Sequence, residues 1–340
     1  MISRRALLAA SLAALPSGAR AEESGRLASL MQSHQVPAAS LAIERNGAIA
    51  DRIAIGADPE TLFQAASISK VVTGLSVLRL VQQGKLALDQ PVTTVPNPFA
   101  SPVTPRLLLS HRGGTNVPGF PGYLPGAPLP SVDQILRGVA PANTPAVRVT
   151  QMPGEAFRYS GGGTMILQRL AMDAAAAPFE KIAATLVLEP AGLARSSFIQ
   201  PMPASTPNVA VAHGANGEPF AGHGHVYPEL GAAGLWSTAG ELAKLALAIT
   251  ADPVTLRHMA TPVGGGPTSL GIFVHRRANR PPILYHYGVN AGFRSVLAFA
   301  ADASFGVALM TNSEGGRALI PAFCGPLFRS NGQGDFPLLD

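Results

Sequence analysis

The sequence predicts an α+β (mixed α/β) fold: an antiparallel sheet flanked by helices, with an inserted, mostly helical lobe. Near the N-terminus, Asn46-Gly47 separates two apolar segments, which is a strong β-hairpin signal. Residues 269–313 read as four adjacent strands, and the intervening chain, about residues 89–235, has helices between Pro- and Gly-rich loops. Runs of adjacent strands with helices before and after them predict a sheet covered by helices.

The elements follow in chain order. A short amphipathic helix is expected at residues 24–34, before the hairpin. The segment from Lys70 is apolar on nearly every side, which is typical of a buried helix, and Gly84 is suited to end it. Ser237 or Thr238, with Glu241 at the third position, forms a capping-box pattern. Further helices are expected at 131–139, 162–176, 178–188, 237–249 and about 316–328, and strands at 269–277, 282–288, 293–300 and 305–313.

The N-terminal segment has the pattern of a secretory signal peptide. Arg4 and Arg5 precede an apolar run, and Ala19-Arg20-Ala21 matches a cleavage site. Ser3-Arg4-Arg5 also resembles a twin-arginine signal. A membrane anchor is the alternative, but the apolar run is too short to span a bilayer. We therefore expect residues 1–21 to be removed, and the mature protein to be periplasmic or secreted without stable membrane insertion.

The remaining residues are expected to form one domain, 22–340. Its sheet lobe would comprise about 24–66 and 236–340, and its helical lobe about 67–235. The chain is 47% hydrophobic and 13% charged, which excludes a disordered protein.

Charge and composition exclude several classes of function. The formal charge of +5 falls to +2 without Arg4, Arg5 and Arg20 (22 basic against 20 acidic residues), so nucleic acid is not an expected partner. The single cysteine, Cys324, excludes an intrachain disulfide and lies in an apolar segment, where a buried thiol is expected. Neither zinc-ligand spacing nor nucleotide-binding glycine motifs occur, so no metal or cofactor is expected.

The stretch "FQAASISKVV" contains the first candidate for chemistry. Ser67 and Lys70 are spaced i, i+3, so their side chains can meet at the start of a helix. A serine needs a base to become a nucleophile, and burial can lower the pKa of a lysine enough to serve. Ser69 faces a different way. The structural alternative is Ser67 as an N-cap and Lys70 as a first-turn residue reaching solvent.

Two later stretches supply partners for this pair. Tyr159, before a Gly-rich turn and a helix, could share the proton relay as a phenolate near Lys70, or could simply pack its ring. His286 and Gly288 lie in a strand, where the glycine would let a substrate approach the backbone. The N–H of Val289 could then be an oxyanion donor beside that of Ser67. The structural alternative for His286 is an ordinary strand histidine.

Taken in order, these stretches resemble the serine β-lactamase/penicillin-binding-protein family, in its class C-like branch. The similar stretches are "VPAASLAIERNG", "FQAASISKVVTGLSVLRLVQQGKLALDQPV", "TPRLLLSHRGG", "FRYSGGGTMILQRL", "LEPAGLARSSF", "GAAGLWSTAGELAKL", "YHYGVNAGFRS" and "ALMTNS". The resemblance implies a β-lactamase/transpeptidase-like fold. It also implies Ser67 as the acylated nucleophile, Lys70 and Tyr159 as the groups that activate it, and His286 at the strand position where lactamases carry lysine.

The sequence departs from the family at two positions. Gly161 stands where the family's Tyr-x-Asn motif has asparagine, and His286 replaces the lysine that would bind a β-lactam carboxylate. Asn290 is expected to supply a substitute polar contact to substrate. Both departures favour neutral esters or small amides over β-lactams.

The function expected from the sequence is an exported serine hydrolase that forms an acyl-enzyme on Ser67. Its expected substrates are small esters or D-amino-acid amides and peptides. A class C-like β-lactamase is one alternative. A catalytically silent protein that binds peptides or cell-wall fragments is the other, from a different functional class. The absence of a G-x-S-x-G motif argues against an α/β-hydrolase.

Overall fold

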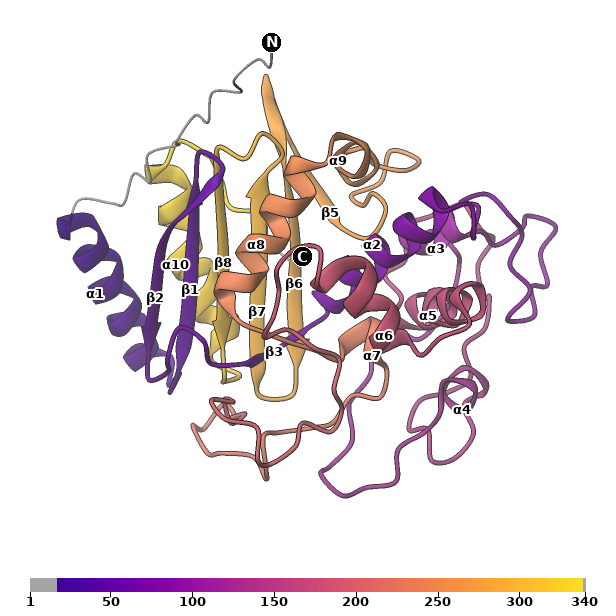
Figure 1. The fold of residues 1–340 in the computed structure, drawn as a ribbon, viewed down its shortest axis with the longest axis horizontal. Coiled ribbons are helices and arrows are strands. Elements are labelled where there is room, and N and C mark those ends of the chain that lie inside the picture. Colours follow the sequence, from indigo (N-terminus) through magenta and orange to yellow (C-terminus); the bar gives the residue numbers. More distant parts are fainter. Residues whose placement is uncertain (1–16, 339–340) are drawn as a thin grey trace, which may run out of the picture.

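A computed structural model describes residues 17–338 (Figure 1). Its main sheet has six strands in the order β2-β1-β8-β7-β6-β5, and every neighbouring pair is antiparallel. The predicted antiparallel sheet with flanking helices is therefore confirmed. The strands are β1 (Ala39–Arg45), β2 (Ala48–Ile55), β5 (Phe273–Arg277), β6 (Arg280–Asn290), β7 (Phe293–Ala300) and β8 (Phe305–Thr311).

Helices cover both faces of this sheet. The terminal helices α1 (Ser17–Ser33) and α10 (Gly316–Ser330) pack on one face, and α8 (Ala239–Ala251) crosses the other, in front of the strands in Figure 1. Alternate residues of a strand point to opposite faces. Accordingly, Leu41 contributes to the core beneath α1 and α10, whereas its neighbour Ala42 contributes to the core on the α8 side. The short helix α9 (Pro253–Ala260) follows α8.

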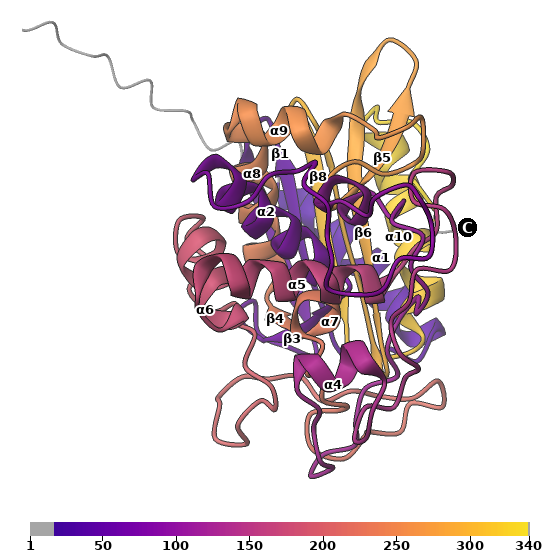
Figure 2. The ribbon, with the colours of Figure 1, turned by 90° about the vertical axis from the view of Figure 1, so that its right-hand side faces the viewer.

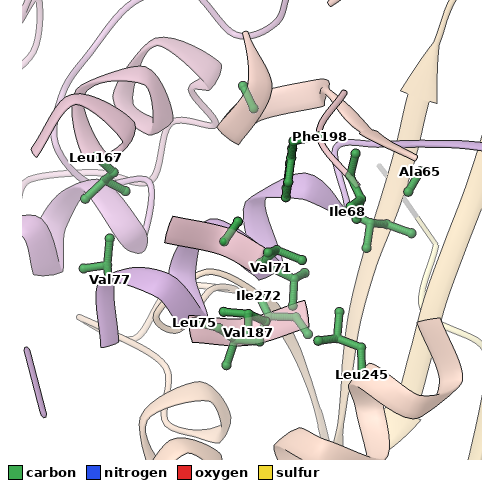
Figure 3. Packing of buried hydrophobic residues seen from close by; sticks show 14 of the residues in the cluster. Ala65, Ile68, Val71, Leu75, Val77, Leu167, Val187, Phe198, Leu245 and Ile272 are labelled. Carbon is green, nitrogen blue, oxygen red and sulfur yellow. The ribbon is translucent and has the colours of Figure 1, made fainter. Parts of the chain in front are cut away.

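The helical lobe is built around α2 (Ser69–Gln82). Figure 2 views this lobe from its own side, with α5 running across it. Val71, Val72 and Val77 of α2 are fully buried, as expected for a helix that is apolar on nearly every side, and Figure 3 shows their neighbours. The other elements are α3 (Pro105–Leu109), α4 (Val132–Arg137), α5 (Gly161–Ala175), α6 (Phe179–Ala183), the π-helical turn η1 (Ala184–Leu188) and α7 (Leu230–Ala233).

A second, two-stranded sheet connects the two lobes. Its strands, β3 (Phe63–Ala66) and β4 (Leu235–Ser237), are antiparallel and were not expected from the sequence. β3 contacts β6 and β7 and leads directly into α2. It therefore carries the Ser67 segment from the main sheet into the helical lobe.

One N-terminal expectation needs correction. The first helix begins at Ser17 rather than at residue 24, so it includes the predicted cleavage site. Residues 1–16, which hold most of the predicted export signal, lie outside the described residues. Between residues 17 and 338, no helix combines the length and the apolar character needed to cross a membrane.

The predicted capping box of α8 forms only in part. Thr238 is the N-cap, and its hydroxyl accepts a hydrogen bond from the Glu241 N–H at 3.1 Å. The Glu241 carboxylate does not return this bond. It accepts hydrogen bonds from the backbone N–H groups of Arg195, at 2.8 Å, and Ser196, at 2.7 Å. Glu241 thus fastens a loop of the helical lobe to α8.

Candidate active site

Ser67 lies at the turn where β3 ends and α2 begins. The preceding residue, Ala66, has a φ of 51°, a left-handed conformation that is uncommon for alanine. Such strain is typical of positions whose geometry serves function. The N-cap of α2 is Ile68, which makes no side-chain capping bond. Ser67 is therefore not the N-cap that the structural alternative required.

Lys70 contacts Ser67 as the i, i+3 spacing predicts. Its Nζ donates hydrogen bonds to Ser67 Oγ at 2.9 Å and to the backbone carbonyl of Ala232, in α7, at 2.7 Å. The side chain does not reach solvent, because Lys70 is only 4% exposed. This burial lowers the pKa of Lys70 to about 7. A substantial fraction of the amine is consequently neutral at physiological pH and can accept a proton.

Tyr159, which lies two residues before α5, completes this cluster. Its ring centre lies 5.1 Å from Lys70 Nζ. Burial raises the pKa of Tyr159 well above its usual range, and a hydrogen bond with Ser67 opposes that shift only in part. Desolvation therefore favours a neutral phenol, which donates a proton, over the phenolate considered from the sequence.

His286 presents an uncharged ring to the same site. Its Nδ1 lies 2.7 Å from the carbonyl oxygen of Tyr287, which can only accept, so Nδ1 carries the proton. Nε2 is buried and has no hydrogen-bond partner among residues 17–338. Burial, with a smaller effect from Lys70, lowers the pKa of His286 to about 3. His286 therefore offers the site a hydrogen-bond acceptor, Nε2, in place of the positive charge that a lysine would bring.

His111 is a site residue that the sequence analysis did not single out. Its ring centre lies 4.5 Å from that of Tyr159, and its Nδ1 accepts a hydrogen bond from the Ser160 N–H at 3.2 Å. Burial lowers its pKa well below the ordinary value, with Lys70 and His286 adding to the effect. His111 thus orients Tyr159 as an uncharged neighbour. The stretch "SHRGG" contained it, but nothing in its spacing relates it to Tyr159.

Gly288 makes room for the protein's own backbone. A Cβ at this position would lie 2.2 Å from the carbonyl oxygen of Ala65 and 2.1 Å from Ser295 Oγ. Ser295 Oγ also donates a hydrogen bond to that same carbonyl at 2.9 Å. Ala65 is two residues before Ser67, so we assign to Gly288 the docking of the Ser67 segment on β6, in place of the expected approach of substrate.

Val289 and Asn290 end β6 beside this docking point. The two-residue loop after Asn290 makes Asn290 and Phe293 a hydrogen-bonded pair, so the Val289 N–H points away from β7. This direction suits the expected oxyanion donor. Asn290 is 3% exposed, and its Nδ2 donates to Gln64 Oε1 at 2.6 Å and to the Ala233 carbonyl at 3.1 Å. Only its amide oxygen remains for the predicted substrate contact.

Phe120 occupies the space that an asparagine side chain at position 161 would need. A Cβ at residue 161 would lie 2.9 Å from the Phe120 ring and 3.3 Å from the Pro118 carbonyl oxygen. That carbonyl accepts a hydrogen bond from the Gly161 N–H at 3.0 Å, which holds the loop against α5. Glycine at position 161, where the family has asparagine, therefore makes room for the Phe120 ring. Nothing in the sequence indicated this contact.

We expect Gly161→Asn alone to destabilise the fold by about 1–3 kcal/mol, because the new side chain overlaps the Phe120 ring. Gly161→Asn combined with Phe120→Ala should recover much of that loss. Chemical denaturation of the four proteins in this double-mutant cycle measures the coupling. Strict additivity of the two changes would show that Gly161 and Phe120 are independent.

These residues line one cavity of about 730 Å³. Ser67, Lys70, Tyr159, His286, Val289 and Asn290 all contribute to its wall, together with the aromatic residues Phe120, Phe157, Phe273, Tyr285 and Tyr287. Among residues 17–338, its lining includes no carboxylate side chain, and Lys70 is its one lysine. Residues 17–338 contain no cluster of three or more His, Cys, Asp or Glu side chains that could hold a metal ion. Cys324 is fully buried in α10.

Comparison with known proteins gives this site its family. The family model described as Beta-lactamase matches residues 24–321, which is most of the chain. The chain belongs to the β-lactamase family. Membership is consistent with a serine hydrolase, and the matched segment includes each of the site residues named above from Ser67 to Asn290.

A curated relative is PbpX of Bacillus subtilis (strain 168), provisionally named a penicillin-binding protein. It is 23% identical over 271 residues, which cover 76% of this chain and 63% of PbpX. The chain thus spans less than two thirds of the length of this relative.

Solved structures share the fold. An octameric penicillin-binding protein homologue from Pyrococcus abyssi has a TM-score of 0.76 at 22% identity, covering 92% of this chain and 78% of its own. EstCE1, described as a hydrolase with promiscuous acyltransferase activity, has a TM-score of 0.72 at 20% identity, covering 94% and 100%. A D-stereospecific amidohydrolase from Streptomyces sp. has a TM-score of 0.73 at 20% identity, covering 91% and 99%.

Proposed function

We propose that the protein is a serine hydrolase that acts through an acyl-enzyme on Ser67, with small neutral esters as its substrates. The observation that carries this proposal is the 2.9 Å contact between Ser67 Oγ and Lys70 Nζ, an amine whose pKa is lowered to about 7. A nucleophile in reach of a base poised near neutral pH is the minimum that acyl transfer requires.

The first half-reaction forms the acyl-enzyme. Neutral Lys70 accepts the Ser67 proton while Oγ bonds to the ester carbonyl carbon, giving a tetrahedral oxyanion. The N–H groups of Ser67 and Val289 are assigned as its donors. As the ester C–O bond breaks, Tyr159 donates its proton to the leaving alkoxide and regains one from protonated Lys70. The acyl group remains on Oγ.

The second half-reaction releases the acid. Water attacks the acyl carbon while Lys70 accepts one water proton, and that proton passes to Ser67 Oγ as its bond to the acyl group breaks. His286 stays neutral throughout and offers Nε2 as a hydrogen-bond acceptor beside the reacting groups. No net charge accumulates on the enzyme over the cycle.

The cavity favours neutral substrates. A free α-ammonium group finds no carboxylate among the described residues of the lining, and it would face the cation that Lys70 becomes during the reaction. A β-lactam carboxylate finds no lysine at the His286 position. The apolar and aromatic walls instead match an ester with hydrocarbon groups on either side of the carbonyl.

D-amino-acid amides are the second candidate substrates, and the amidohydrolase among the fold neighbours favours them. Export to the periplasm or medium is also part of the proposal, and it rests on the N-terminal sequence alone.

A panel of substrates tests this function. We expect a short-chain nitrophenyl ester to be turned over, and a chromogenic cephalosporin to be hydrolysed at least about 100-fold less efficiently because its carboxylate lacks a cation. Turnover of a D-amino-acid nitroanilide tests the second candidate activity, the hydrolysis of D-amino-acid amides. Faster cephalosporin turnover would favour the β-lactamase alternative. A folded protein that turns over no substrate and is not labelled by a fluorophosphonate would be the silent binding protein.

Ester hydrolysis should depend on pH through Lys70. We expect kcat/KM to rise with an apparent pKa near 7, because only neutral Lys70 accepts the Ser67 proton. The profile should then stay level to about pH 9, since the pKa of Tyr159 is raised and His286 is neutral above about pH 3. An inflection above pH 9.5 would instead indicate a lysine with an ordinary pKa.

A further inference from the structure

A strap at the C-terminal end of the described chain reaches the catalytic cavity. The strap, residues 331–338, follows α10 and doubles back along the sheet. Arg277 fastens it by donating to the Gln333 side chain at 2.8 Å and to its carbonyl at 3.2 Å. Arg45 Nε donates to Asn331 Oδ1 at 3.1 Å, and Arg280 binds the Gly332 carbonyl. The strap is thus tied to strands β1, β5 and β6.

The end of the strap is held by Tyr287. Tyr287 Oη donates a hydrogen bond to the Pro337 carbonyl at 2.9 Å. Phe336 is 5% exposed, with its ring centre 6.1 Å from that of Tyr287 and 4.9 Å from that of Phe328. Leu338, by contrast, is 59% exposed although it is apolar and follows directly on these anchors. The strap therefore fixes an exposed apolar side chain at a defined place.

That place is the boundary between two cavities. Leu338 lines the catalytic cavity and also a second cavity of about 410 Å³. Val289 and Tyr287 line both as well, and Val289 is 53% exposed. Leu338 and Val289, here called the rim pair, are two large exposed apolar side chains on the border between the cavities. Val289 also carries the assigned oxyanion donor, so the border adjoins the reacting carbonyl.

The second cavity lies between β6–β7 and the first turns of α10. Ile320 and Pro321 give it an apolar wall. Arg294 and the exposed Arg317 also line it. The Arg294 guanidinium already donates to the carbonyls of Asn290, at 2.6 Å, and Phe293, at 2.7 Å, and pairs with Glu314. The apolar wall and the rim pair are therefore the parts of this cavity best suited to a hydrocarbon chain.

We propose that Leu338 is a specificity-determining residue, and that the second cavity accepts the distal part of an apolar chain that passes from the reacting carbonyl across the rim pair. The preferred substrates are then esters with medium-length alkyl or acyl chains rather than acetates. This inference rests on the proposed function and names its substrate class. Each methylene group that moves from water into the second cavity strengthens binding. The value of kcat/KM should therefore grow with chain length until this cavity is filled.

A larger side chain at position 338, which would narrow the passage between the two cavities, tests whether Leu338 determines specificity. Leu338→Trp should lower the octanoate-to-acetate ratio of kcat/KM about tenfold, mainly through a higher KM for octanoate. Two series, with the chain on the acyl side or on the alcohol side of the ester, show which half of the substrate crosses the rim. Leu338→Met is the volume-conserving control. Val254→Trp is the matched control, because Val254 is a 54% exposed apolar residue of α9 that lines neither cavity.

Two results would overturn the inference: an unchanged octanoate-to-acetate ratio in both series, or an equal loss for acetate and octanoate. A binding measurement keeps it testable even without turnover. Calorimetric titration of wild type and Leu338→Trp with 2-alkanones, which carry a ketone where the ester would be, should show affinity that rises with chain length only in wild type. If Ser67 were not labelled but binding still depended on chain length, the proposed hydrolase function would be contradicted. The proposed binding of an apolar chain in the second cavity would still be supported.

Discussion

Replacing Ser67 with alanine is expected to lower ester turnover by about 10⁴- to 10⁶-fold and to abolish covalent labelling by a fluorophosphonate. The reason is that Ser67 Oγ lies 2.9 Å from Lys70 Nζ, the amine that takes its proton. Steady-state kinetics with a nitrophenyl ester measure the first effect, and intact-protein mass measures the second.

Ser69→Ala is the matched control for this variant. Ser69 is fully buried, donates to the Ala66 carbonyl at 2.5 Å and accepts from the Leu235 N–H at 2.9 Å. Its loss should destabilise the protein by about 1–3 kcal/mol, because the Leu235 N–H loses its partner. Labelling of the folded protein should remain. If Ser69→Ala abolished labelling and Ser67→Ala did not, the nucleophile would be assigned to the wrong serine.

Replacing Lys70 with methionine is expected to lower kcat/KM for the same ester by about 10³-fold, the range for removal of a general base. It should also change how stability depends on pH. Folding lowers the pKa of Lys70 from 10.5 to about 7, so between these values the unfolded chain binds more protons and stability rises with pH. At pH 7 and below, the folded protein carries the full cost of a buried ammonium.

Lys70→Met should therefore be more stable than wild type near pH 6, by about 1–3 kcal/mol after allowance for the unpaired Ala232 carbonyl. The difference should change sign as the pH rises, so that Lys70→Met is less stable than wild type above pH 10, where only the loss of the hydrogen bond to the Ala232 carbonyl remains. Denaturant titrations at pH 6, 8 and 10 follow this trend. Lys85→Met, at an exposed position after α2, is the control and should alter neither activity nor the pH dependence. A loss of stability at every pH would show that Lys70 is not a desolvated base.

Much of the fold was predictable because its signals are local. The Asn46-Gly47 hairpin, the apolar pattern of α2 and the C-terminal strands each depend on residues close in sequence. The strands β3 and β4 were missed because a strand of three or four residues has no readable period. They pair segments about 170 residues apart, so only the tertiary structure brings them together.

The candidate site shows the same division. Ser67 and Lys70 were predictable from i, i+3 spacing, and Tyr159 and His286 from resemblance. His111 and Phe120 were not predictable, since each acts by contact with a residue about 40–50 positions away. The protonation of Tyr159 depends on burial, which a sequence does not give directly.

Acylation of Ser67 is tested by measuring the mass of the intact protein during turnover of a slowly hydrolysed ester, followed by peptide mapping. We expect a transient adduct with the mass of the acyl group on the peptide that contains Ser67. The adduct should be absent from Ser67→Ala and retained by Ser69→Ala. Hydrolysis without any adduct under single-turnover conditions, or an adduct on another residue, would contradict the central claim that Ser67 is acylated.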